Sequence, residues 1–376
     1  MPIKILQFTS LGNRYDMVDN IVQFADKEKF EVGICVRTDR IHIELPVYQK
    51  DTFYRVLNKD LSRKAIPQTV WHLAQVLREW KPDILHTHHY EEAFIGFLAK
   101  KLCSRIKLIV GRHYSDFFYC LPQGVKTRAL LKIEGLSNNA AEKIIVPTRS
   151  VAELLIERQD ISSNKVKVIP YGFVDEKFDQ PSDADIKKLR SELNFEGRFV
   201  VGNFSKLITE KGLSYLIMAA ARLRSKIPHL LIVIAGEGRD QKIFERQVSK
   251  LGLEGTIKFL GFRQDAMTLM SAVNVVAQTS LQEAFGQVVV EAMWMKKPIV
   301  TTDVGVAADI IETEVNGILI PKSDENSIAK ALEKLANDEF LCQKLADNGQ
   351  KFVKNNLAIK KIIKTYEDTY KQVVGV

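Results

Sequence analysis

The chain lacks paired cysteines. Its four cysteines, Cys35, Cys103, Cys120 and Cys342, are scattered over 376 residues without regular spacing. A disulfide framework or a structural zinc site needs cysteines at short, regular spacings. We therefore expect neither, and the thiols fit a reducing compartment such as the cytosol.

Long hydrophobic runs are also missing. No apolar stretch reaches the roughly 20 residues of a membrane-spanning helix. Residues 1–8 are too short and too regularly alternating for a signal peptide, so they predict a strand. Hydrophobic residues make up 46% and charged residues 27% of the chain, which is typical of a soluble globular protein. We expect a cytoplasmic protein that is long enough for two domains.

Positive charge is concentrated in one segment. The net charge is +8, and residues 100–132 hold eight basic residues against one acid, Asp116. The basic residues are Lys100, Lys101, Arg105, Lys107, Arg112, Lys126, Arg128 and Lys132. With the aromatic residues 117–119, they predict contact with an anionic membrane surface; the alternative is a solvated face. No nucleic-acid recognition module accompanies the charge, so we expect no nucleic-acid partner.

Short apolar runs alternate with amphipathic segments along the chain. Continuous apolar runs such as 231–235 are what a parallel sheet buried on both faces requires, and the alternation predicts two doubly wound α/β domains. The strands expected in the first half are 3–8, 30–36, 83–87, 106–111, 143–147 and 166–170. Those expected in the second half are 198–203, 230–235, 256–261, 273–279, 298–302 and 317–321.

A polar segment separates the two halves. Residues 172–185 lack helix or strand periodicity and predict the break. We expect an N-terminal Rossmann-like domain over 1–178, a C-terminal one over 179–357, and a final helical stretch over 358–376. Ligands of such sheets bind beyond the carboxyl ends of the strands. Two domains facing across a cleft would therefore bring two substrates together there.

The segment 283–291, EAFGQVVVE, joins a predicted strand to a predicted helix. The backbone N–H groups of Phe285, Gly286 and Gln287 lie at the helix N-terminus, which suits a phosphate. Glu283 and Glu291 flank that position, and carboxylates suit sugar hydroxyls better than phosphate. The alternative is a loop residue followed by a helix-stabilising one.

The loop after strand 198–203 carries two lysines, Lys206 and Lys211. Two ammonium groups at one strand end can neutralise a diphosphate leaving group; the alternative is a pair of solvated lysines. Gly236 and Gly238 would let a nucleotide approach the backbone, or serve only a tight turn. The third glycine of a dinucleotide fingerprint is missing, which disfavours a nicotinamide-dependent dehydrogenase.

Histidines follow two predicted strands of the first half. His86, His88 and His89 lie at the end of one strand, and His113 follows the next. Such a histidine can bond to a sugar hydroxyl or phosphate oxygen, or act as a base; the alternative for His86 is a packed strand residue. Nothing in the sequence brings metal ligands together, so we expect no metal. The Asp-Ala-Asp at 183–185 is expected to cap a helix.

Together these residues resemble glycosyltransferase family 4, whose members have the GT-B fold of two Rossmann-like domains. The resemblance spans nearly the whole chain. It is strongest in 283–304, EAFGQVVVEAMWMKKPIVTTDV, which is similar to the family's Glu-x7-Glu block and the strand after it. Segment 201–216 is similar to the family's Gly-Arg-Leu…Glu-Lys-Gly signature. There Lys206 takes the arginine position and Lys211 the lysine position.

The resemblance implies a role for each matching residue. Lys206 and Lys211 would hold the donor diphosphate. Glu291 would bind the ribose and Glu283 the donor sugar, while His88 or His113 would face the reacting centre. The other expected donor-binding residues are Gly12, Asn13, Gly236, Gly238, Phe262, Arg263, Phe285, Gly286 and Gln287. The final helix would cross back onto the N-terminal domain.

Three positions depart from the family pattern. The first loop has Gly12-Asn13 in place of Gly-Gly, which weakens the case for close phosphate approach there. Lys206 replaces an arginine, losing bidentate geometry but keeping the charge. Tyr171-Gly172 stands where Asn-Gly is common.

The resemblance implies a retaining, metal-independent, hexosyltransferase-type enzyme without a cofactor. It would move a sugar from a nucleotide-diphosphate sugar to an acceptor hydroxyl. The basic, aromatic segment 100–132 adds the expectation that the acceptor is a lipid-linked or cell-surface glycan precursor, at the inner face of the membrane. The family's proposed route is front-side displacement. Two alternatives stay open: a GT-B sugar-nucleotide epimerase, which forms product without an acceptor, and a catalytically silent nucleotide-sugar-binding protein.

Overall fold

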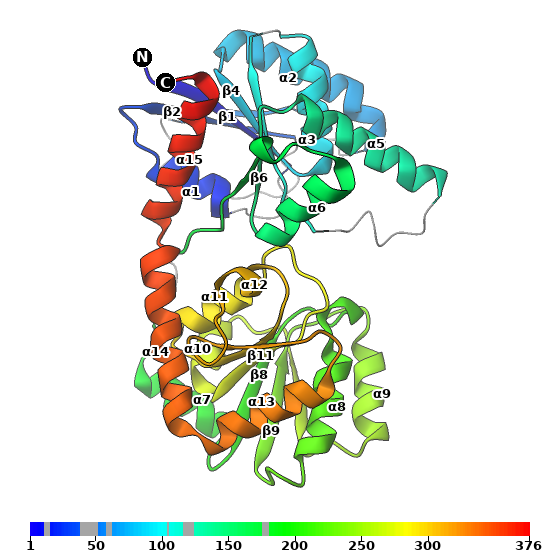
Figure 1. Cartoon of the computed structure of the whole chain (residues 1–376), viewed down its shortest axis with the longest axis vertical. Coiled ribbons are helices and arrows are strands. Elements are labelled where there is room, and N and C mark those ends of the chain that lie inside the picture. Colours follow the sequence, from blue (N-terminus) through cyan, green and yellow to red (C-terminus); the bar gives the residue numbers. More distant parts are fainter. Residues whose placement is uncertain (11–15, 38–51, 58–61, 104, 116–123, 175–179) are drawn as a thin grey trace. The chain divides into compact units, whose positions relative to one another are not determined.

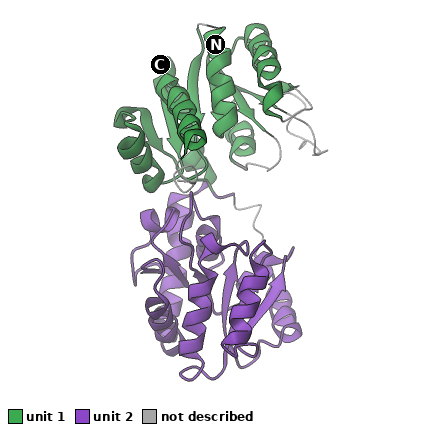
Figure 2. Cartoon of the chain, turned by 90° about the vertical axis from the view of Figure 1, so that its right-hand side faces the viewer, with its two compact units in different colours: residues 1–172, 359–376 green, residues 173–358 purple. Residues whose placement is uncertain are grey.

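The chain forms two compact units, each built on its own sheet. The computed structural model describes residues 1–10, 16–37, 52–57, 62–103, 105–115, 124–174 and 180–376 (Figure 1). Unit 1 comprises Met1–Gly172 and Ile359–Val376, and unit 2 comprises Phe173–Ala358 (Figure 2). The sequence predicted domain boundaries after residues 178 and 357. The structure divides the chain after residues 172 and 358.

Unit 1 contains a seven-stranded sheet in the order β3-β2-β1-β4-β5-β6-β7, and its strand pairs are parallel. The strands are β1 Ile3–Thr9, β2 Phe30–Val36, β3 Tyr54–Val56, β4 Ile84–His88, β5 Lys107–Gly111, β6 Lys143–Val146 and β7 Val166–Val168. The α-helices described are α1 Asp16–Phe24, α2 Ile66–Trp80, α3 Tyr90–Lys101, α5 Val125–Ala140, α6 Arg149–Gln159 and α15 Ile359–Val374.

Unit 2 contains a six-stranded sheet in the order β10-β9-β8-β11-β12-β13, again with parallel pairs. The strands are β8 Phe199–Phe204, β9 Leu230–Ala235, β10 Ile257–Gly261, β11 Val275–Gln278, β12 Ile299–Thr302 and β13 Ile318–Ile320. The helices are α7 Asp183–Glu192, η5 Thr209–Lys211, α8 Leu213–Leu223, α9 Gln241–Lys250, α10 Ala266–Ala272, α11 Gln287–Trp294, α12 Val306–Ile310, α13 Glu325–Asn337 and α14 Glu339–Asn356.

Burial on both faces explains the apolar strands. Every residue of β8 and β9 is buried, including the run from Leu230 to Ala235. Helices cover both faces of each sheet (Figure 1), so no face of these central strands meets water. Each Val, Leu or Ile withdrawn from water in this way stabilises the fold by about 1.5–3 kcal/mol.

Helix α15 belongs to unit 1 although the whole of unit 2 precedes it in the sequence. It lies beside α1 (Figure 1). Ile362, Ile363, Tyr366 and Tyr370 are buried at helical spacing, and Glu367 accepts a hydrogen bond from the Asp26 backbone N–H at 2.8 Å. One amphipathic face therefore fixes the helix to the first sheet.

The sequence-based prediction of two doubly wound parallel sheets is confirmed. All twelve expected strands occur, with ends shifted by at most two residues, and the short strand β3 is an addition. The cap of α7 is Ser182, whose Oγ accepts from the Asp185 N–H at 3.1 Å. Asp183 and Asp185 thus lie in the first turn and do not occupy the capping position itself. None of the helices described is long and apolar enough to span a bilayer.

Both sheets reverse direction at one position. In unit 1 the order reverses between β1 and β4, and in unit 2 between β8 and β11. Ligands of open α/β sheets bind at this switch point, beyond the carboxyl ends of the strands. The loops that follow these four strands are therefore the places to look for functional side chains.

Candidate active site

An ion pair joins the two loops at the switch point of unit 2. Lys211 follows β8 and Glu283 follows β11; Lys211 Nζ lies 2.5 Å from Glu283 Oε1. Ser280 Oγ donates to the same oxygen at 2.8 Å. The lysine and glutamate side chains are 19% and 14% exposed, so the pair is largely shielded from water, which strengthens the attraction. The structure thus brings together two residues that the sequence predicted separately.

The backbone holds this pair in register. Gly212 has φ +65°, and a Cβ there would lie 1.9 Å from the carbonyl oxygen of Thr279. The Leu281 N–H donates to the Glu210 carbonyl at 2.9 Å. Only glycine allows the β8 and β11 loops to approach this closely in that conformation.

A third loop, after β12, closes around Glu283. Gly305 has φ +56°, and a Cβ there would lie 2.4 Å from the Phe285 carbonyl oxygen and 2.8 Å from Glu283 Cβ. The Val306 N–H donates to the same carbonyl at 2.6 Å. The sequence analysis missed both Gly305 and Ser280. The signal available for the first was a glycine directly after the 283–304 block.

The remaining residues of the β8 and β9 loops are arranged differently. Lys206 is exposed, and its side chain makes no hydrogen bond or ion pair with any other described residue. A Cβ on Gly236 would lie 2.0 Å from the Ser205 carbonyl oxygen, and one on Gly238 would lie 2.3 Å from that of Leu207. These glycines therefore allow the β9 loop to pack on the loop of Lys206, which favours the turn interpretation.

The loop after β10 presents an aromatic ring. Phe262 is 71% exposed, and its N–H donates to Glu237 Oε1 at 3.4 Å. Arg263 forms a two-pronged contact with Asp265, at 2.7 and 2.5 Å. An exposed ring beside a strand end suits stacking on a flat ligand.

The helix after β11 begins where the sequence placed it. Gly286, with φ +88°, is the N-cap of α11 and Gln287 its first residue. Phe285 is buried, Gln287 is exposed and Glu291 is half-buried. Gly12 and Asn13, the expected donor residues of the first loop, lie outside the described residues.

In unit 1 the predicted histidines converge at the switch point. His88 Nδ1 lies 2.9 Å from His113 Nε2, and His88 Nε2 lies 2.8 Å from Gln7 Oε1. Gln7 Nε2 donates to Tyr370 Oη at 3.1 Å, and Tyr171 Oη lies 2.7 Å from His113 Nδ1. The sequence predicted the two histidines but none of their three partners, which come from β1, α15 and the loop after β7.

Burial keeps these histidines neutral at pH 7. It lowers the pKa of His86 to about 3 and that of His89 to about 4. Burial, with the neighbouring histidines, also holds the pKa of His88 and His113 well below the usual value. His86 and His88 are 0% exposed, so His88 acts on a ligand only through His113. His86 fits the packed-strand interpretation.

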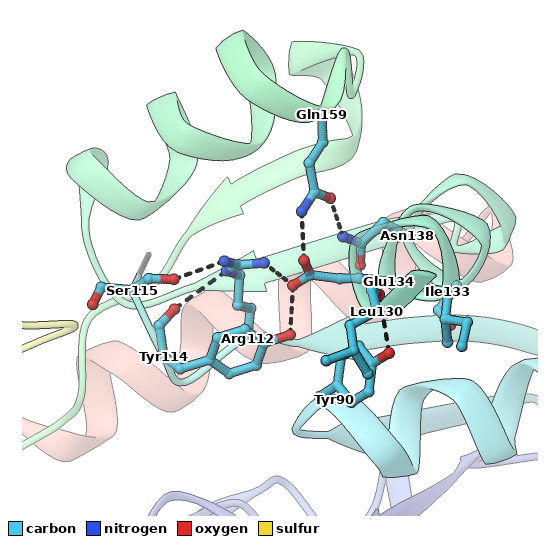
Figure 3. A network of polar contacts seen from close by, with 10 residues as sticks. Tyr90, Arg112, Tyr114, Ser115, Leu130, Ile133, Glu134, Asn138 and Gln159 are labelled. Atoms are coloured by element: carbon cyan, nitrogen blue, oxygen red, sulfur yellow. Dashed lines mark hydrogen bonds and ion pairs between the residues drawn. The ribbon is translucent and has the colours of Figure 1, made fainter. Parts of the chain in front are cut away.

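A buried ion pair holds the loop after β5 (Figure 3). The guanidinium of Arg112, 1% exposed, pairs with Glu134 of α5 and donates to the carbonyl oxygens of Tyr114 at 3.2 Å and Ser115 at 2.7 Å. Glu134 also accepts from Tyr114 Oη at 2.5 Å and Gln159 Nε2 at 2.6 Å. These contacts tie the residues around His113 to α5.

The same contacts correct the expectation for the basic segment. Arg112 is buried in its ion pair, and Lys100 pairs with Glu142 at 2.9 Å, so these two do not contribute to a charged surface. The exposed basic residues of the segment are Lys101, Arg105, Lys107, Lys126, Arg128 and Lys132. The aromatic residues 117–119 lie outside the described residues.

Comparisons with known proteins agree with this architecture. The family model described as Glycosyl transferases group 1 matches residues 185–352, and the model Glycosyltransferase Family 4 matches residues 17–177. The putative glycosyltransferase EpsD of Bacillus subtilis (strain 168) is 33% identical over 74% of this chain and 74% of EpsD. The capsular polysaccharide biosynthesis glycosyltransferase CapM of Staphylococcus aureus is 23% identical over 98% of this chain and 96% of CapM.

A solved structure is similar over both units. HepE of Anabaena in complex with UDP has a TM-score of 0.83 and 26% identity, over 98% of this chain and 100% of HepE. Two doubly wound units and this structural similarity show the GT-B fold, and the family matches show the glycosyltransferase class. The chain belongs to glycosyltransferase family 4.

Gly305→Ala should destabilise unit 2 more than alanine at an unobstructed glycine of positive φ. Gly197 has φ +65° with nothing within 4 Å of an added Cβ, so Gly197→Ala gives the cost of a positive φ in open space, about 1–2 kcal/mol. Gly305 combines φ +56° with ψ −137°, a conformation that favours glycine, and that strain with the collision with the 283–285 loop should add about 1–3 kcal/mol. Urea unfolding of both variants measures the difference, and equal losses would contradict the close approach.

Glu134→Gln should destabilise unit 1 strongly. It leaves the buried Arg112 guanidinium without its counter-ion, which typically costs about 3–5 kcal/mol. The matched control is Glu79→Gln, which breaks a pair with Arg55 whose side chains are 61% and 51% exposed and should cost less than about 1 kcal/mol. Thermal unfolding compares them; similar losses would show that the buried pair is not needed.

Proposed function

We propose that the chain is a retaining, metal-independent transferase that moves a sugar from a nucleotide-diphosphate sugar to an acceptor hydroxyl. The observation that carries the proposal is the shielded Lys211–Glu283 pair at the switch point of unit 2. The pair places an ammonium group, which can bind the diphosphate, beside a carboxylate, which can bind a hydroxyl of the sugar.

The lysines supply the phosphate-binding charge. An ammonium has three protons; Lys211 uses one on Glu283, and its others can bind phosphate oxygens. Lys206, exposed and unpaired among the described residues, adds a second positive charge from the same loop. Positive groups held in place before the reaction stabilise the charge that develops on a departing diphosphate.

The carboxylates supply hydroxyl recognition. Glu283 lies at the end of β11, with Lys211 and Ser280 fixing one of its oxygens, so it can accept from a donor sugar hydroxyl. Glu291, on α11, would accept from the ribose. Phe262 would stack on the base. Gly12 and Asn13 keep their expected role near the donor, and no metal ion is assigned to these steps.

Relatives support the choice of substrates. Structures of HepE hold UDP and UDP-glucose, so a uridine-diphosphate sugar is the first donor to test. CapM is named for capsular polysaccharide biosynthesis, which supports a glycan precursor, lipid-linked or at the cell surface, as the acceptor. Product formed without any acceptor would favour the epimerase alternative, and binding without turnover would favour the silent one.

An anionic membrane surface is a second proposed partner. On α5, the side chains of Lys126, Arg128 and Lys132 are exposed, and Val125 and Leu136 are 86% and 47% exposed. The helix has a single acidic residue, and that carboxylate is buried in its ion pair. A cationic face with exposed apolar side chains suits the headgroup region of an anionic bilayer, which would place the enzyme peripherally at the inner membrane face.

Lys211→Ala and Glu291→Ala should give different kinetic signatures. Loss of Lys211 removes leaving-group stabilisation, so kcat/KM should fall by roughly 100- to 1,000-fold with a large effect on kcat. Loss of Glu291 removes ground-state binding as well, so it should mainly raise the donor KM. Steady-state transfer from UDP-sugars measures both.

The matched control for Lys211→Ala is Lys226→Ala, which breaks an ion pair with Glu333 whose lysine is 55% exposed. It should leave kcat and KM unchanged. Wild-type kinetics in both Lys211→Ala and Glu291→Ala would mean that the site is assigned to the wrong residues.

Replacing Lys126, Arg128 and Lys132 together by glutamate should abolish binding to anionic vesicles. Each basic residue near the surface contributes about 1 kcal/mol, so removing three weakens binding by at least about 100-fold. Co-sedimentation with phosphatidylglycerol vesicles at low salt measures this. The control replaces Lys242, Arg246 and Lys250, exposed on α9; an equal loss there would mean a general charge effect.

A further inference from the structure

One chain of hydrogen bonds runs through unit 1 from the loop after β7 to helix α15. Its members, in order, are Tyr171, His113, His88, Gln7, Tyr370 and His86. The successive contacts are 2.7, 2.9, 2.8, 3.1 and 2.9 Å long, each within hydrogen-bond range. Four of these residues, His88, Gln7, Tyr370 and His86, are at most 1% exposed, so water does not compete for the hydrogen bonds between them.

The side-chain amide of Gln7 determines which atom donates and which accepts in each of these hydrogen bonds. Its Oε1 only accepts, so His88 donates to it through Nε2–H. A neutral imidazole carries one proton, so His88 Nδ1 accepts, and the donor is His113 Nε2–H. By the same count His113 Nδ1 accepts from the hydroxyl of Tyr171.

The Nε2 atom of the same amide determines the tautomer of His86 through Tyr370. Gln7 Nε2–H donates to Tyr370 Oη, and among the described residues His86 Nδ1 is the acceptor within reach of the proton of that hydroxyl, so we assign the proton to that bond. His86 therefore carries its proton on Nε2, a buried nitrogen with no hydrogen-bond partner among the described residues. All three histidines then have the same tautomer.

The rings are packed so that they cannot rearrange independently. A Cβ on Gly111 would lie 3.0 Å from both His113 Nε2 and His88 Nδ1 and 3.2 Å from His86 Nε2. The ring centroids of His86 and His88 are 4.3 Å apart. With the rings fixed, only the protons and the Gln7 amide can change, and turning the amide over reverses every donor and acceptor together. The three histidines share one tautomer in either arrangement.

We propose that Gln7 and Tyr370 are positioning residues for sugar transfer. Through this chain they fix the tautomers of His88 and His113, and so hold the His113 ring and the Tyr171 hydroxyl in one orientation at the carboxyl edge of the first sheet. The effect on rate rests on the proposed function; the shared tautomer does not.

The consequence for a substrate lies at Tyr171. Its one proton is committed to His113, so toward a sugar hydroxyl its oxygen acts as an acceptor. His113 has both ring nitrogens bonded within the protein, so it orients Tyr171 and is not itself a base. Through these hydrogen bonds Tyr370 of α15, 363 positions from Gln7, acts on the orientation of Tyr171 at the carboxyl edge of the first sheet.

Nitrogen-15 NMR of histidine-labelled full-length protein tests the chain directly. We expect His86, His88 and His113 all to carry the proton on Nε2. In Gln7→Glu both carboxylate oxygens only accept, so His88 and His113 keep that tautomer while the Tyr370 proton turns to the new carboxylate. His86 should then move its proton to Nδ1. Mixed tautomers in the wild type, or an unchanged His86 in the variant, would overturn the proposal.

A matched pair of conservative variants tests the effect on rate. Tyr370→Phe removes one link, whereas Tyr366→Phe removes a hydroxyl from the preceding turn of α15. Tyr366 is equally buried and lies near His86, but it makes no hydrogen bond with the described members of the chain. We expect kcat to fall on the order of tenfold in Tyr370→Phe and to stay unchanged in Tyr366→Phe, with the donor KM unchanged in both because the donor loops belong to unit 2.

The outcomes separate the two proposals. If the wild type transfers sugar and the two variants have equal kcat, the positioning role is overturned. If the wild type transfers no sugar from any donor while the three histidines share one tautomer, the proposed function fails and the hydrogen-bond chain stands.

Discussion

The interaction on which the site depends is the contact between Lys211 and Glu283 across the switch point of the second sheet. It requires the β8 and β11 loops to approach through Gly212 and the β12 loop to fold over Glu283 through Gly305. Because three loops of one parallel sheet meet there, the charges are largely shielded before any ligand arrives. A preorganised pair of this kind costs little reorganisation during a reaction. The proposed chemistry therefore depends on the packing of these three loops.

Unit 1 has a different arrangement at its own switch point, between β1 and β4. The groups from Tyr171 to His86 are neutral and hydrogen-bonded in sequence, and the adjacent Arg112–Glu134 ion pair ties the loop after β5 to α5. Buried polar groups are tolerated when they have partners, and a connected network makes its members change together; within this one, His86 Nε2 lacks a hydrogen-bond partner among the described residues. Tyr370 of α15 supplies one partner, so the helix that ends the sequence completes the interior of the unit that begins it.

The sequence predicts what is local. Apolar runs located twelve strands, and the loops after two of them indicated Lys211 and Glu283, which the structure brings into contact. β3 escaped because it has three residues, is largely exposed and contains Arg55. Gln7 and Tyr370 escaped because their contact joins residues 363 apart, and no local pattern distinguishes a glutamine or tyrosine that will be buried. Arg112 was misjudged because a charge run does not reveal which member is paired inside.

A crystal structure of the protein with UDP tests the central claim most directly. The account predicts diphosphate oxygens within about 3.5 Å of the side-chain nitrogens of Lys206 and Lys211, with the ribose at Glu291. A diphosphate bound away from both lysines would contradict it.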